Sequence, residues 1–194
     1  MRLAAHLCGT RVNEVLSGND DFLSTLRARG FQRVQINATA INGVDTSKLA
    51  ESVDALVAII LKHVELEFIL QKNEETRPLW EMLLNTVISN GGWPPNCSML
   101  VDESKGTGTL SSSWQQPPQE FDIGYAGGIG PSNISKVLDE ISDVAQGREI
   151  WIDMESLLRS IKNEEDVFDL NKCYEVIDVV CRSGFHTHPK YLPS

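Results

Sequence analysis

The stretch FDIGYAGGIGPSNISKVLDEI, residues 121–141, joins an apolar run, a glycine-rich turn and a helical pattern. Four glycines fall within seven positions: Gly124, Gly127, Gly128 and Gly130. Apolar side chains then recur at helical spacing from Ile134, after a proline and a serine. A chain omits side chains in this way where a turn needs positive φ angles, or where something must approach the backbone closely.

The composition is that of one ordinary globular domain. The chain has 194 residues, 41% hydrophobic and 23% charged, enough for a sizeable core. Its net charge of −10 argues against nonspecific binding to nucleic acid or to an anionic membrane, and no apolar stretch approaches the length of a membrane span. The four cysteines match no zinc pattern and indicate free thiols in a reducing cytoplasm.

Short apolar runs alternate with amphipathic helical patterns along the chain. This alternation predicts a single α/β domain with a parallel sheet. The segment 109–120, TLSSSWQQPPQE, is polar and proline-containing, so we expect a long loop there, with Trp114 either covering the barrel mouth or packing on its rim. Residues 186–194 are expected to form a flexible tail. The predicted strands are Leu3–Leu7, Arg33–Asn37, Glu67–Gln71, Ser98–Asp102, Ile123–Ala126 and Ile150–Met154, and the predicted helices lie near 12–29, 49–61, 79–87, 134–141 and 170–177.

An open doubly wound sheet and a (β/α)8 barrel both fit this alternation. Polar or glycine residues follow every predicted strand. A barrel gathers all such strand ends on one face, where its sites lie, whereas an open sheet gathers only the pair at its switch point. The pattern therefore favours a TIM-type barrel, incomplete, with about six βα units.

Two of these strand ends carry the sharpest candidates, each with a structural alternative. Gly127 and Gly128 would expose backbone N–H groups beside a helix N-terminus, which makes a phosphate seat; the alternative is a tight turn that needs glycine for positive φ. Asp102, with Lys105 after it, suits general acid–base chemistry. The alternative for Asp102 is that it caps its loop and pairs with Lys105.

The remaining polar strand ends are candidate substrate contacts. Asp153, Glu155 and Ser156 follow the last predicted strand, which in a barrel neighbours the glycine-rich strand and would share a phosphate with it. Arg159 lies close by in the sequence. Asn37, Lys72 and Asn73 follow earlier strands and are candidates for binding substrate hydroxyls, with loop solvation as the alternative.

The order of these motifs resembles phosphoribosylanthranilate isomerase, of the ribulose-phosphate-binding barrels. The resemblance rests on DESKGTG at 102–108, AGGIGPSN at 126–133 and IDMES at 152–156, which match the ends of the sixth, seventh and eighth strands of that family. Gln35 in VQIN matches the glutamine of the family's fourth strand. HLCG at 6–9 is similar to the motif that carries the family's general base on its first strand.

The resemblance implies a phosphosugar-binding barrel that needs no metal or other cofactor. The phosphate would be held by backbone groups near Gly127 and Gly128 and by Ser156. Asp102 would be the general acid of an Amadori-type isomerisation, and Cys8 the candidate base. Gln35 would contact the substrate.

The chain also departs from the family pattern. Glu155 replaces a phosphate-binding serine and Leu157 a glycine, and a carboxylate beside a phosphate weakens binding unless Arg159 offsets it. Counting back from the eighth strand makes the first strand here the third, so about two βα units are absent. Such a barrel has open sheet edges. If residues 1–194 are the native chain, we expect a second copy of the chain to cover these edges; the alternative is that an N-terminal segment is missing from the sequence.

Three functions therefore remain open at this point. The first is an isomerase-like enzyme acting on a phosphosugar. The second is a non-catalytic descendant that serves as a binding or structural module. The third is a different sugar-phosphate enzyme, an epimerase or aldolase, in which Lys72 or Lys105 would form a Schiff base or stabilise charge.

Overall fold

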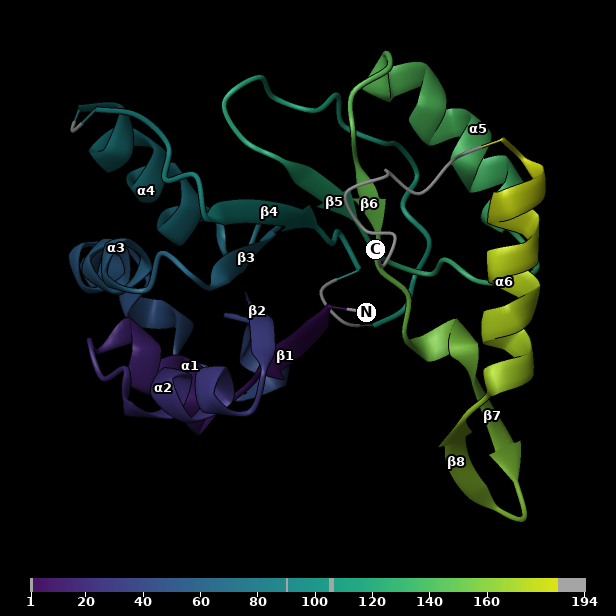
Figure 1. Ribbon diagram of the computed structural model, residues 1–194, viewed down its shortest axis with the longest axis horizontal. Coiled ribbons are helices and arrows are strands. Elements are labelled where there is room, and N and C mark those ends of the chain that lie inside the picture. Colours follow the sequence, from purple (N-terminus) through teal and green to yellow (C-terminus); the bar gives the residue numbers. More distant parts are fainter. Residues whose placement is uncertain (1, 90, 105–106, 185–194) are drawn as a thin grey trace.

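The computed structural model describes residues 2–89, 91–104 and 107–184, and a sheet of six parallel strands lies at its centre. The strands pair in chain order, so each lies beside its predecessor, and the sheet curls into a half-barrel (Figure 1). A doubly wound sheet would reverse its strand order, so the architecture agrees with an incomplete α/β barrel. The strands are β1 (Leu3–Leu7), β2 (Phe31–Ile36), β3 (Glu67–Lys72), β4 (Cys97–Val101), β5 (Ile123–Tyr125) and β6 (Trp151–Ile152).

Helices cover the outer face of the sheet in two groups (Figure 1). The first group packs on β1–β4 around residues such as Leu56, Phe68 and Met99. The second group packs beside β5 and β6 around Tyr125 and Ile134. The first group comprises α1 (Thr10–Leu16), α2 (Asp21–Ala28), α3 (Val53–Lys62) and α4 (Arg77–Ser89), and the second comprises α5 (Ile134–Ala145) and α6 (Leu170–Arg182).

The two faces of the sheet differ because side chains alternate along each strand. Phe68 and Leu70 of β3 are buried in the first helix group's core. Their neighbours Glu67 and Gln71 project from the opposite, concave face. There Glu67 accepts two hydrogen bonds from Arg33, at 2.8 and 2.9 Å. The concave face therefore carries polar side chains beside a small apolar cluster of Ile69, Leu100, Ala126 and Trp151.

The connection from β4 to β5 contains no helix within its described residues, which confirms the predicted loop. Trp114 from this loop is buried, stands edge-on to Tyr125 with 5.7 Å between ring centroids, and donates from Nε1 to Glu140 of α5 at 2.9 Å. Trp114 therefore packs against β5 and α5, where a crossover helix would otherwise lie.

The structure differs from the sequence-based expectation after β6. A hairpin of β7 (Arg159–Lys162) and β8 (Glu165–Phe168) precedes α6 and was not predicted. Its turn places Asn163 and Glu164 at φ 52° and 66°. Of the Asn-Gly pair that usually marks such a turn only the asparagine is present, so the turn was not recognised. The predicted strand Ile150–Met154 is shorter, and the single helix predicted near 12–29 is two helices, α1 and α2.

Aspartate side chains cap two helix starts. Asp169 caps α6, accepting from the Asn171 N–H. Asp45 caps only a short 3-10 turn, Thr46–Lys48, and α3 begins later, at Val53. Within the described residues, no helix is both long and apolar enough to cross a bilayer. Residues 186–194, expected to form a tail, lie outside the described residues.

Candidate functional site

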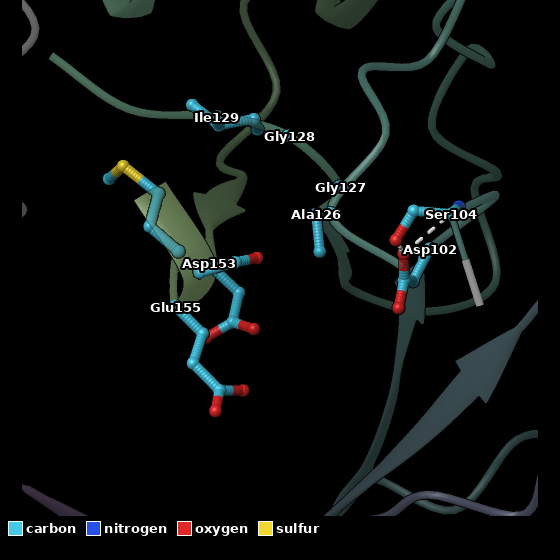
Figure 2. Close-up of a pocket in the computed structure, with 11 residues that line it drawn as sticks. Asp102, Ser104, Ala126, Gly127, Gly128, Ile129, Asp153 and Glu155 are labelled. Atoms are coloured by element: carbon cyan, nitrogen blue, oxygen red, sulfur yellow. Dashed lines mark hydrogen bonds between the residues drawn. The ribbon is translucent and has the colours of Figure 1, made fainter. Parts of the chain in front are cut away.

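A cavity of about 60 Å³ lies at the carboxyl ends of β4, β5 and β6 (Figure 2). The turn 126–129 after β5 forms one wall, and Ser104, Gly108 and Ser156 contribute to the rest. Three carboxyl groups, those of Asp102, Asp153 and Glu155, also line it. The cavity thus unites the three strand ends that the sequence had marked.

The glycine-rich turn needs its glycines for two reasons at once. Gly127 and Gly128 have φ of +102° and +62°, which other residues adopt only with strain. A Cβ on Gly128 would lie 2.3 Å from the Leu110 nitrogen, and one on Gly127 would lie 3.2 Å from the Thr109 carbonyl oxygen. The loop after β4 is therefore what approaches this backbone so closely, and the positive φ angles expected at both glycines are confirmed.

The turn that leads into α5 presents backbone N–H groups to the cavity. The Asn133 side chain accepts from the Gly130 N–H at 2.9 Å and donates to the Gly128 carbonyl at 2.7 Å. No described residue accepts a hydrogen bond from the N–H groups of Gly127, Gly128 or Ile129. These donors line the cavity beside a helix N-terminus, where an anion is stabilised.

Gly124 and Gly130 have separate packing roles. A Cβ on Gly124 would lie 2.2 Å from the Trp151 ring, so this glycine gives room to an aromatic side chain of β6. A Cβ on Gly130 would lie 2.5 Å from the Leu157 Cβ. Leu157, which departs from the family pattern, thus packs on the turn.

Asp102 is buried and held by its neighbours. Its Oδ1 accepts from the Ser104 hydroxyl at 2.5 Å and from the Ser104 N–H at 3.1 Å, and its Oδ2 accepts from Gln71 Nε2 at 2.8 Å. A carboxylate offers about four lone-pair positions, so one on Oδ2 remains open. The predicted loop cap is confirmed, while Lys105, its expected partner, lies outside the described residues.

Asp153 has the electrostatic character expected of a proton donor. Burial raises the pKa of its carboxyl, and the negative charges of Glu155 and Asp102 raise that pKa further. His6 and Arg33 act in the opposite direction on the pKa of Asp153. Sequence reasoning placed Asp153 as a substrate contact, because desolvation cannot be read from the sequence.

Ser156 and Arg159 are separated by the structure. Ser156 lines the cavity, and its Oγ would lie 2.6 Å from a Cβ on Gly108. Arg159 instead begins the hairpin and donates from Nε to Asp166 at 2.8 Å. The cation expected to offset Glu155 is therefore paired elsewhere.

Cys8, Gln35 and Asn37 form a second polar group at the ends of β1 and β2. Gln35 Nε2 donates to Asn37 Oδ1 at 2.8 Å, and Asn37 Nδ2 donates to the Cys8 Sγ at 3.6 Å. None of the three lines the cavity beside Asp102. The cysteine and the aspartate are not brought together, because two strands, β2 and β3, separate β1 from β4.

Asn73 and Lys72 also lie outside this cavity. Asn73 is buried, accepts from the Thr76 N–H at 3.1 Å and donates to the Asp102 carbonyl at 3.3 Å, so it shapes the loop after β3. Lys72 lines a different cavity, on the helix side of the sheet. Among the described residues, no group of three His, Cys, Asp or Glu side chains is placed to hold a metal ion.

Comparison with known proteins adds no assignment. No family model matches the sequence. The curated proteins likewise contain no match.

Proposed function

We propose that this half-barrel binds a phosphorylated sugar-like ligand at the carboxyl ends of β4–β6 and acts on it by acid–base isomerisation. The observation that carries the proposal is the convergence of unlike groups on one cavity. Free N–H groups of the turn 127–129 and the Ser156 hydroxyl lie with the buried carboxyl group of Asp102 and the partly buried one of Asp153. Backbone donors suit a phosphate, and carboxyl groups suit sugar hydroxyls and proton transfer.

The size of the cavity limits how the ligand would lie. About 60 Å³ is well below the roughly 300–1,000 Å³ of small-molecule sites, so the cavity accommodates a phosphate group and not a whole sugar phosphate. The sugar would extend past Asp102 and Asp153 toward the concave face. Asp153 would donate the proton, because burial raises the pKa of its carboxyl. Asp102 would accept one at the open position of Oδ2.

A second candidate is a binding module without catalysis, and a specific observation favours it. Glu155 adds a third carboxyl to the cavity, and Arg159 is engaged by Asp166 instead of offsetting that charge. Repulsion between Glu155 and a phosphate weakens binding. An uncharged polyol would avoid this cost.

Ligand-dependent melting separates these candidates. The chain is titrated with ribulose 5-phosphate, with ribulose and with inorganic phosphate. At a hundredfold excess over Kd a ligand adds about 2.7 kcal/mol, which raises Tm by roughly 5–10 °C for a chain of this size. Ser156→Ala should reduce the shift with the phosphorylated sugar, whereas Ser142→Ala, an exposed serine on α5, should not. No shift with the phosphorylated sugar would refute the proposal.

Catalysis is tested separately from binding. In D2O, an isomerase that moves a proton next to a carbonyl exchanges that hydrogen for deuterium, which proton NMR detects. Asp153→Asn should retain the melting shift and lose the exchange. A melting shift without any exchange in the unaltered chain would leave the binding module as the function.

A further inference from the structure

The missing helix between β4 and β5 leaves space on the outer face of the sheet. In a regular βα unit a helix would fill the position between α4 and α5. Here Trp114 and the rest of the loop 109–120 cover it. The cover is incomplete, because a cavity of about 320 Å³ remains beneath the loop.

This outer cavity has an apolar part and a polar part, and the polar part holds one cation and one carboxylate. Leu84 of α4, Pro118, Phe121 and Ile123 of β5 form the apolar part, and Gln115, Gln116 and the exposed Glu120 also line the cavity. Its only lysine or arginine among the described residues is Lys72, at the end of β3. Its volume lies at the lower end of the range for small-molecule sites, about 300–1,000 Å³.

Lys72 is half-buried and lacks an ion pair with any described carboxylate. Its Nζ donates to Gln115 Oε1 at 2.5 Å and lies 4.7 Å from the centroid of the Trp80 ring. Burial lowers the pKa of its amine, against weaker effects of Glu103 and Glu74. An ammonium in this position gains from an anion that replaces the water it has lost.

We propose that the outer cavity binds a small anion with an apolar body, its carboxylate or sulfonate head on Lys72 and its body against Leu84, Phe121 and Ile123. This site is separate from the phosphosugar cavity. Gln71, the preceding residue, points to Asp102 on the concave face, whereas Lys72 lies against Trp80 of α4 on the helix side. The proposal therefore stands whether or not the proposed isomerase function is correct.

Fluorescence of 8-anilinonaphthalene-1-sulfonate, an apolar anion, provides the test. The dye should bind saturably, and octanoate should displace it while octanol, the neutral analogue, should not. Lys72→Met keeps the length of the side chain without its charge and should weaken dye binding roughly tenfold. Lys136→Met is the matched control, because Lys136 is an exposed lysine on α5, and it should bind the dye as the unaltered chain does.

Three results would overturn the proposal: no saturable binding, displacement by octanol as effective as by octanoate, or equal affinity in the two lysine variants. If Lys72→Met fails to fold, judged by circular dichroism, the comparison of octanoate with octanol on the unaltered chain decides alone. On the unaltered chain, the concentrations of octanoate and of 1-naphthoate that displace half of the dye show whether the cavity prefers an aliphatic or an aromatic body.

Discussion

Replacing Gly128 with alanine tests whether the glycine-rich turn is dictated by the loop that packs on it. The added Cβ would lie 2.3 Å from the Leu110 nitrogen and 2.7 Å from the Thr109 carbonyl carbon. Both are backbone atoms, so no side-chain rotation relieves the clash, and the loop must move. The φ of +62° adds the strain of a left-handed residue, about 1 kcal/mol. With about 2 kcal/mol for overpacking, the expected loss of unfolding free energy is about 3 kcal/mol.

Gly30→Ala provides the matched control for this prediction. Gly30 also has a positive φ, +84°, but a Cβ there would meet nothing within 4 Å. Its variant should lose only the conformational part, about 1 kcal/mol. Urea denaturation followed by circular dichroism measures both variants against the unaltered chain. Equal losses in the two variants would refute the reasoning, because the contact with Leu110 would then contribute nothing.

Three further predictions concern pH and assembly. Hydrogen bonds, first from Lys62 and then from His63, lower the pKa of Asp20. The Asp20 carboxylate therefore stabilises the fold above the ordinary carboxyl pKa, and this stabilisation is lost as the pH falls through the lowered pKa. The urea midpoint of Asp20→Asn should thus fall less on acidification than that of the unaltered chain. The pH dependence expected from Asp153 has the opposite sign. Its pKa is raised in the folded chain, so the free energy of unfolding falls as the pH rises from about 3.9, the ordinary carboxyl pKa, toward the raised pKa. Asp153→Asn should thus gain stability relative to the unaltered chain at pH 7 compared with pH 3.5, and an unchanged difference would contradict this. We also propose that a second copy covers the open sheet edges: sedimentation should give about twice 21.5 kDa, and Leu3→Lys on the edge strand β1 should reduce it to one copy, whereas a monomeric unaltered chain would exclude the dimer.

Much of the fold was predictable because its signals are local. Near-continuous apolar runs such as Glu67–Gln71 mark strands buried on a sheet, and the structure has β3 there, one residue longer. The loop after β4 was predictable from its prolines and polar residues. The hairpin β7–β8 was not, because its strands are short and exposed and its turn lacks glycine.

The sequence predicted which residues are candidates for the site, but it did not predict which of them lie together. Asp102, the glycine pair and Ser156 could be named from strand ends, and the structure gathers them in one cavity. Cys8 was grouped with them by resemblance, and it lies with Asn37 outside that cavity. The register and order of strands decide such neighbours, and both are properties of the whole sheet.

The sequence by itself determined the alternation of strands and helices, the loop after β4 and the positions of the polar strand ends. Each of these follows from side-chain periodicity and turn chemistry within a short window of the chain. Three features became clear only from the tertiary structure: the loop backbone that packs against Gly127 and Gly128, the pairing of Arg159 with Asp166, and the outer cavity lined by Lys72. These depend on contacts between segments far apart in the sequence, and burial and close approach arise only when such segments meet.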